Sequence, residues 1–171
     1  MSGLLAAYPQ LKTADVHAND FHTVSIAVFE RVPKALWCSD TCYLMDEDGV
    51  VYTPVARGAL RYITYLGAAS TTPPVHYLTQ DQFHSLSALV DALAQKEAST
   101  SIQTVSVDAA GDVEAVFTGS FVLKFRLADA GGDIFERFTL ALQSDPFKAH
   151  PLSAFLYLDL RFGDKLYYKL R

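Results

Sequence analysis

Residues 113–127, VEAVFTGSFVLKFRL, read as two β-strands joined by a tight turn at Thr118-Gly119-Ser120. The second strand alternates strictly, and its apolar face is formed by Phe121, Leu123, Phe125 and Leu127. A period of two predicts a strand that buries one face and exposes the other, as in an antiparallel sheet. The preceding stretch, 102–107, predicts a further strand that reaches this pair through the turn at 108–112.

A helix is expected immediately upstream, over residues 80–97. Thr79 and Gln82 have the spacing of a capping box, in which each side chain bonds the other residue's backbone N–H. Apolar residues then recur at spacings of three and four: Phe83, Leu86, Leu89, Val90 and Leu93. Such a stripe is typical of an amphipathic helix packed on a sheet.

Downstream, Gly131-Gly132 interrupts the sheet, and the spacing of Phe135, Phe138 and Leu142 predicts a second helix that extends toward Phe147. The final stretch, 157–171, is YLDLRFGDKLYYKLR, and it predicts two more strands around a Gly-Asp turn.

The first third of the chain is also mostly extended. Residues 4–8 are expected to end a helix at Pro9. In residues 21–30, Val24, Ile26 and Val28 share one face, which predicts a half-buried strand. The Asp48-Gly49 pair between two apolar runs predicts a hairpin, because glycine supplies the positive φ that the turn needs. A strand is also expected over 61–66.

The expected order of elements is strands, a helix, three strands, a helix and two strands. This order predicts an α+β fold: a mostly antiparallel β-sheet with two or three helices packed on one face. The last strand is expected at a sheet edge. Chain ends are usually polar and frayed, so an aromatic, β-prone end is unusual.

Composition excludes several classes of function. The 171 residues are half hydrophobic and 19% charged, with a net charge of −5. This is typical of a folded domain rather than a disordered chain. The chain has no lysine- and arginine-rich block to bind nucleic acid. It has neither an apolar run long enough to span a membrane nor the basic start of a signal peptide.

Two cysteines are candidates for chemistry. Cys38 and Cys42 flank a three-residue loop between strands expected to pair, which brings their Cβ atoms within reach of a disulfide. Two reduced, buried thiols fit the sequence equally well. The spacing is not the Cys-x-x-Cys of redox proteins, and the five scattered histidines do not supply a zinc ligand set.

Acidic residues offer two further candidates. The run 46–49, DEDG, lacks the remaining ligands of a calcium loop, so an exposed acidic turn is expected. Asp159 and Arg161 share a face of one strand, which predicts ion pairing on a solvated sheet surface more readily than catalysis. No nucleotide-binding, hydrolase or metalloprotease motif is present. We therefore expect no catalytic residues, no metal and no cofactor.

Three segments together resemble a known family. Residues 8–11 and 24–37 are similar to the pattern YPxV…IxVxERxPxAxW of the bacterial cell-division proteins FtsQ and DivIB. Residues 42–52, CYLMDEDGVVY, resemble the hairpin that follows in that family. Residues 157–162 and 165–169 resemble its terminal strands. The three motifs occur in the family's order.

The resemblance implies a non-enzymatic scaffold of the divisome, anchored in the cell membrane by one helix, with this part on the extracytoplasmic side. Residues 1–33 would be the end of a POTRA domain, and residues 34–171 the β domain. The cytoplasmic tail, the membrane helix and the first part of the POTRA domain are not in this sequence. An extracytoplasmic location favours a Cys38–Cys42 disulfide.

The family's partners are the small coiled-coil proteins FtsB (DivIC) and FtsL. The resemblance implies that they are recruited by strand addition at the last strand. Carried onto this chain, the implied contact residues are Phe162, Gly163, Asp164, Lys165, Leu166, Tyr167, Tyr168, Lys169 and Leu170.

Two other functions remain open at this point. An extracytoplasmic module unrelated to division could bind a small ligand or polymer through an aromatic cluster of Tyr62, Tyr65 and Tyr77. A hydrolytic enzyme would need a nucleophile beside a histidine, and no pattern in the sequence indicates one.

Overall fold

The computed structural model describes residues 2–18, 22–68, 73–96 and 101–171. Within these ranges the fold is α+β, as predicted, and contains a two-stranded and a ten-stranded sheet. The small sheet pairs β1 (Leu11–Ala18) with β2 (Val24–Glu30), and α1 (Ser2–Ala7) contacts β1.

The large sheet has the order β12-β11-β10-β9-β8-β6-β3-β4-β5-β7. Its strands are β3 (Pro33–Cys38), β4 (Cys42–Asp46), β5 (Val50–Val55), β6 (Thr64–Gly67), β7 (Val75–His76), β8 (Ile102–Val107), β9 (Asp112–Phe117), β10 (Val122–Arg126), β11 (Phe155–Phe162) and β12 (Lys165–Leu170). Three neighbouring pairs, β3–β6, β6–β8 and β10–β11, are parallel, and the other described pairs are antiparallel.

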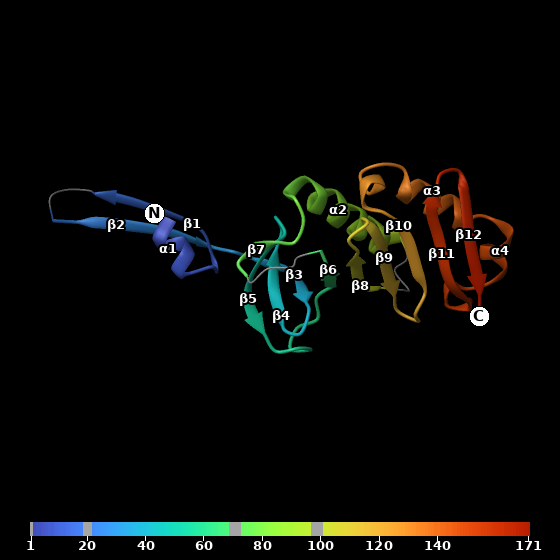
Figure 1. Cartoon of the computed structure of the whole chain (residues 1–171), viewed down its shortest axis with the longest axis horizontal. Coiled ribbons are helices and arrows are strands. Elements are labelled where there is room, and N and C mark those ends of the chain that lie inside the picture. Colours follow the sequence, from blue (N-terminus) through green and yellow to red (C-terminus); the bar gives the residue numbers. More distant parts are fainter. Residues whose placement is uncertain (1, 19–21, 69–72, 97–100) are drawn as a thin grey trace.

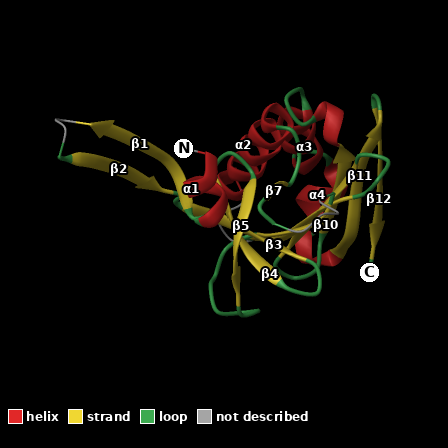
Figure 2. Ribbon diagram, turned by 60° about the vertical axis from the view of Figure 1, so that its left-hand side comes forward, coloured by secondary structure: helices red, strands yellow, loops and turns green. Residues whose placement is uncertain are grey.

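The helices lie where parallel pairing requires a crossover. Consecutive parallel strands cannot be joined by a hairpin, so the chain must cross a face of the sheet between them. The helix α2 (Gln80–Lys96) connects β6 and β7 to β8, and α3 (Ile134–Leu142) and α4 (Asp145–Ala149) connect β10 to β11. Short 3-10 turns at Leu127–Asp129 and Leu152–Ala154 border these crossovers. Figure 2 shows α2 and α3 together over the sheet, with β12 at its far edge.

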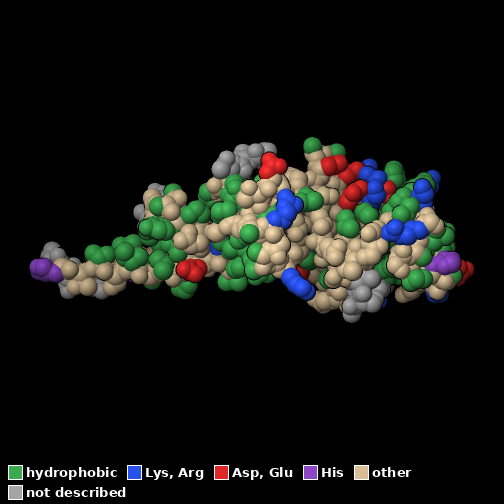
Figure 3. Space-filling view, turned by 90° about the horizontal axis from the view of Figure 1, so that it is seen from below, with side chains coloured by type: hydrophobic (Ala, Val, Ile, Leu, Met, Phe, Trp, Pro, Cys, Tyr) green, Lys and Arg blue, Asp and Glu red, His purple; other side chains and the backbone are tan. Residues whose placement is uncertain are grey.

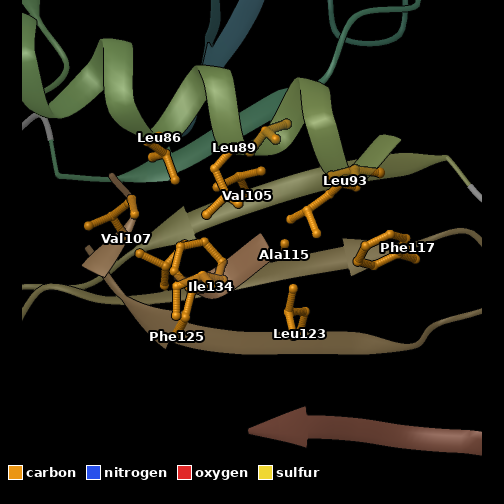
Figure 4. Close-up of a cluster of buried hydrophobic side chains, with 14 of the residues drawn as sticks. Leu86, Leu89, Leu93, Val105, Val107, Ala115, Phe117, Leu123, Phe125 and Ile134 are labelled. Carbon is orange, nitrogen blue, oxygen red and sulfur yellow. The ribbon is translucent and has the colours of Figure 1, made fainter. Parts of the chain in front are cut away.

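The core forms between α2 and strands β8–β10. Figure 4 shows Leu86, Leu89 and Leu93 pointing from the helix onto side chains of these strands, such as Val105 and Ala115. The predicted alternation in β10 is confirmed, since Phe121, Leu123 and Phe125 are fully buried. The capping box also forms: the Thr79 N–H donates to Gln82 Oε1, and the Gln82 N–H donates to Thr79 Oγ1.

The second predicted helix is in fact two helices. Ser144 stands at the N-cap position of α4, but its hydroxyl donates to the Ala141 carbonyl rather than capping the helix. Pro146 occupies the first turn of α4, where proline is tolerated because that N–H needs no partner in the helix. The same proline cannot continue α3. The buried stripe of α3 is Ile134, Phe138 and Ala141, and Phe135, one of the residues whose spacing predicted this helix, is exposed.

Two predictions about strands also need correction. The strand expected over 61–66 begins only at Thr64. Val24, Ile26 and Val28 share a face as predicted, but each is about half exposed or more, so β2 is not half-buried. The reason is that β1 and β2 form a separate hairpin, which projects from the body as a narrow arm (Figures 1 and 3).

Ion pairs join the base of this arm to the β4–β5 turn. Lys12 Nζ lies 2.8 Å from Glu47 Oε1 and 2.7 Å from Asp48 Oδ2, and Arg31 Nη1 lies 2.5 Å from Asp46 Oδ2. The large sheet begins at Pro33, directly after the arm. The chain thus passes from the small sheet to the large one between Glu30 and Pro33.

Candidate partner-binding edge

The large sheet ends in two unequal strands. At one end β7 comprises only Val75 and His76, and at the other end β12 comprises six residues. Among the described residues, β12 pairs with β11 alone. The prediction that the last strand lies at a sheet edge is therefore confirmed. A very short edge strand offers little to an incoming strand, whereas a long one is a template for pairing.

A two-residue turn sets the course of β12. Phe162 pairs with Lys165, and Gly163 and Asp164 form the connection, with Gly163 at φ +56°. The guanidinium of Arg137 on α3 donates to the Gly163 carbonyl and so ties this turn to the helix layer.

The backbone of β12 directs alternate residues toward and away from β11. The Arg171 N–H donates to the Ala154 carbonyl at 2.9 Å, so Arg171 faces inward. Because hydrogen-bonding direction alternates along a strand, Lys165, Tyr167 and Lys169 also face inward. The N–H and C=O groups of Leu166, Tyr168 and Leu170 then point away from the sheet.

The side chains of β12 lie on two faces. Tyr168 packs edge-on against Phe147 of α4 and Phe155 of β11, which places it on the helix side together with Leu166 and Leu170. Tyr167 is on the opposite, open side, where it packs edge-on against Phe162, with ring centroids 5.2 Å apart. Every residue of β12 is exposed despite these contacts.

A groove of about 190 Å³ runs between α3 and β12 on the helix side. This α3–β12 groove is lined by Arg137, Leu140, Ala141, Ser144, Leu160, Asp164 and Leu166. The contribution of α3 to this edge was not predicted from the sequence. One signal was available: Leu140 lies off the buried stripe of its helix, and its exposed fraction is 57%. A single exposed apolar residue is common on protein surfaces, so Leu140 becomes informative only once the structure places it beside the exposed Leu166.

An ion-pair network lies under the edge, on the open side. Arg161 Nη2 is 2.6 Å from Asp159 Oδ2, and Arg161 Nη1 donates to Asp112 on β9. The sequence predicted an ion pair on a solvated face, but Asp159 is only 6% exposed. Burial alone would raise the pKa of this carboxyl. The hydrogen bonds and positive charge of Arg161 outweigh burial and lower the pKa of Asp159 below its usual value.

The tyrosines considered as a ligand cluster do not form one. Tyr65 and Tyr77 are buried in the core, where their rings pack edge-on against each other and against Phe83. The Tyr77 hydroxyl donates to the Leu66 carbonyl at 2.8 Å, and burial raises the pKa of both phenols. Tyr62 lies apart from them, partly exposed.

The acidic run at 46–49 forms a structural turn. The carboxylate of Asp46 is buried and accepts hydrogen bonds from the N–H groups of Asp48 and Val50 as well as from Arg31, so the predicted exposure of Asp46 is wrong. Across the described ranges, no group of three or more His, Cys, Asp or Glu side chains is placed to hold a metal ion. No helix in those ranges is both long and apolar enough to cross a membrane.

The two cysteines are joined. Cys38 at the end of β3 pairs with Cys42 at the start of β4, and their sulfurs form a disulfide. Both side chains are buried with Leu36 in a small apolar cluster.

No relative was found by comparison with known proteins: no family model matches the chain, and a search of curated proteins finds no significant match.

Proposed function

We propose that this protein is a non-enzymatic scaffold of the FtsQ/DivIB kind, and that it binds an FtsB- or DivIC-like partner, with its FtsL-like companion, by strand addition at β12. The observation that carries the proposal is the geometry of this edge. A six-residue strand ends the sheet, and its outward N–H and C=O groups are aligned for a further strand.

The places of the family-like motifs support the same proposal. Residues 24–37 form β2, the passage into the large sheet and most of β3. Residues 42–52 form β4, the turn and the first half of β5, and residues 157–169 form most of β11 and most of β12. Each motif thus corresponds to an element that builds the arm, the hairpin or the edge.

The disulfide supports the proposed extracytoplasmic location. Disulfides such as Cys38–Cys42 persist in oxidising compartments and are rare where thiols are kept reduced. On this proposal a membrane helix that is not in this sequence anchors the protein.

A proline substitution tests the proposal at the edge itself. In Leu166→Pro or Tyr168→Pro, an outward N–H is removed while the ladder to β11 is kept. Because proline cannot donate the bond that an added strand needs, we expect binding of an FtsB- or DivIC-like segment to weaken at least about tenfold. Isothermal titration calorimetry with the candidate partner from the same organism measures the change.

Tyr167→Pro is the matched control, because it removes an inward N–H that bonds to β11. Its main effect should be on the free energy of unfolding rather than on the affinity for the partner. Hydrogen exchange of the wild-type protein provides a check independent of any partner: the Leu166 and Tyr168 amides should exchange much faster than those of Tyr167 and Lys169. If Leu166→Pro and Tyr168→Pro fold and bind the partner as the wild type does, strand addition at β12 is wrong.

A further inference from the structure

The two faces of β12 differ sharply in chemistry, and the difference bears on what kind of strand can pair with it. Leu166, Tyr168 and Leu170 form an apolar row on the helix side. Lys165, Tyr167 and Lys169 form a row on the open side that holds two positive charges and no negative one. A strand added at this edge continues both rows, since residues opposite each other in a sheet share a face.

On the helix side, the apolar row borders the α3–β12 groove. Leu166 on the strand and Leu140 on the helix are both exposed, and Ala141 and Leu160 form the apolar floor between them. A groove of about 190 Å³ has room for one large aliphatic or aromatic side chain. An incoming strand that places an apolar residue here covers surface that water otherwise contacts.

On the open side, the two lysines are not neutralised. Within the described ranges, neither Lys165 nor Lys169 has a carboxylate within ion-pair distance, although the whole chain carries a net charge of −5. The nearest acidic group of the neighbouring strand, Asp159, is held by Arg161.

Other charges near the edge are engaged elsewhere. Arg137 in the groove donates to the Gly163 carbonyl and lies 4.0 Å from Asp133 Oδ1. The Arg171 guanidinium donates to the carbonyls of Ser153, Gly119 and Ser120. Asp164 lines the groove on the helix side. The lysine row is therefore the open positive charge that an added strand meets.

A second copy of this chain is a poor occupant of the edge. Antiparallel pairing of two β12 strands through their free edges puts one copy's lysine row on the same face as the other's. Parallel pairing through the same edges turns one copy over, so that its lysine row continues the other copy's apolar row. Like charges directly opposite each other destabilise a strand pair, and edge lysines are a common device against self-association. Opposite charge on the partner removes this penalty.

We infer that the β12 edge selects an extended polypeptide segment in which acidic residues alternate with large apolar residues. The acidic side chains lie over Lys165 and Lys169, and one apolar side chain enters the α3–β12 groove beside Leu140. The inference rests on the proposed function, because it assumes strand addition at β12, and it adds the sequence pattern that the edge accepts.

Synthetic peptides test the pattern directly. The probes are a peptide of alternating Glu with Val and Leu, its counterpart with Lys in place of Glu, and a peptide of the acidic composition in which all Glu residues precede the apolar ones. We expect the alternating acidic peptide to bind the full chain at least about tenfold more tightly than either other peptide. Its binding should weaken as salt is raised, because the charges are at the surface. Fluorescence anisotropy measures the affinities, and amide chemical shifts locate the site.

Charge reversal in the protein gives the complementary result. In the Lys165→Glu, Lys169→Glu double variant the preference should invert, so that the alternating lysine peptide binds more tightly. Lys34→Glu, at the far side of the sheet, is the control variant and should leave the preference unchanged. Leu140→Ser should weaken both alternating peptides, because it makes the groove polar.

The outcomes separate this inference from the proposed function. If both alternating peptides bind wild type equally and both lose binding in Leu166→Pro, strand addition stands and the charge pattern is overturned. If no peptide changes the chemical shifts of the β12 amides at millimolar concentration, strand addition itself fails and the inference fails with it. If the wild type dimerises through β12 while the double variant stays monomeric, the occupant is a second copy, and the inference is overturned.

Discussion

At the residue scale, Asp159 is a charged group kept ionised inside a sheet. It contributes to stability because Arg161 contacts both of its carboxylate oxygens and also reaches Asp112. A buried carboxylate without that partner would lose several kcal/mol of solvation. The network thereby joins β11, which supports the candidate edge, to β9 in the middle of the sheet.

Asp159→Asn should therefore lower the free energy of unfolding by about 1–3 kcal/mol at pH 7. The pKa of Asp159 is lower in the folded state than the value of about 3.9 in an unfolded chain. Its stabilising effect is then fully present above about pH 4 and is lost as the pH falls through the folded-state pKa. Urea denaturation at several pH values measures both proteins, and the difference between them should shrink in acid. A difference that stays constant down to pH 2 would contradict this role.

At the element scale, the β3–β4 hairpin is closed by the disulfide between Cys38 and Cys42. A covalent link across so short a loop removes little freedom from the unfolded chain, so its stabilising effect should be small. The hairpin also has a buried apolar cluster on one face and Trp37 in the main core on the other.

We expect reduction of the disulfide to lower the free energy of unfolding by about 2 kcal/mol and to leave the fold intact. Chemical denaturation with and without a reducing agent measures the change. The Cys38→Ala, Cys42→Ala double variant is the control, because its midpoint should not respond to the reducing agent. A wild-type midpoint that is equally unresponsive would show that the link contributes nothing.

At the scale of the whole molecule, the chain divides into an arm and a body. The body buries a continuous core between helices and sheet, whereas the β1–β2 arm exposes apolar side chains such as Val24 and Ile26 (Figures 1 and 3). A two-stranded hairpin alone is marginally stable in water. The arm therefore depends on α1 and on the ion pairs of Lys12 and Arg31 with the β4–β5 turn.

Native-state hydrogen exchange should separate the two parts. We expect the backbone amides of β1 and β2 to open with a free energy at least about 2 kcal/mol below that of β8 and β9. Arg31→Ala should widen the gap, since it removes the link to the buried carboxylate of Asp46. Equal protection of β2 and β9 would mean that the arm and the body unfold as one unit.

Local sequence patterns predicted much of the fold. The alternation of Phe121, Leu123 and Phe125, the capping box of Thr79 and the Asp48-Gly49 turn each depend on neighbours a few residues away. Those neighbours are visible in the sequence, so these elements were predicted correctly. The exposure of Ile26 was not predicted, because burial depends on whether another layer covers the strand. The break between α3 and α4 could have been predicted from the sequence, since Pro146 is typical of the first turn of a new helix.

The sequence alone determined that the chain ends in a β-strand with an apolar and a basic row, because side chains alternate along any strand. The tertiary structure alone decided which backbone groups of that strand face outward and which helix borders it. Pairing with β11 sets the direction of each N–H, and the crossover from β10 to β11 places Leu140 beside the edge. Both depend on contacts between residues far apart in the chain, which no local pattern encodes.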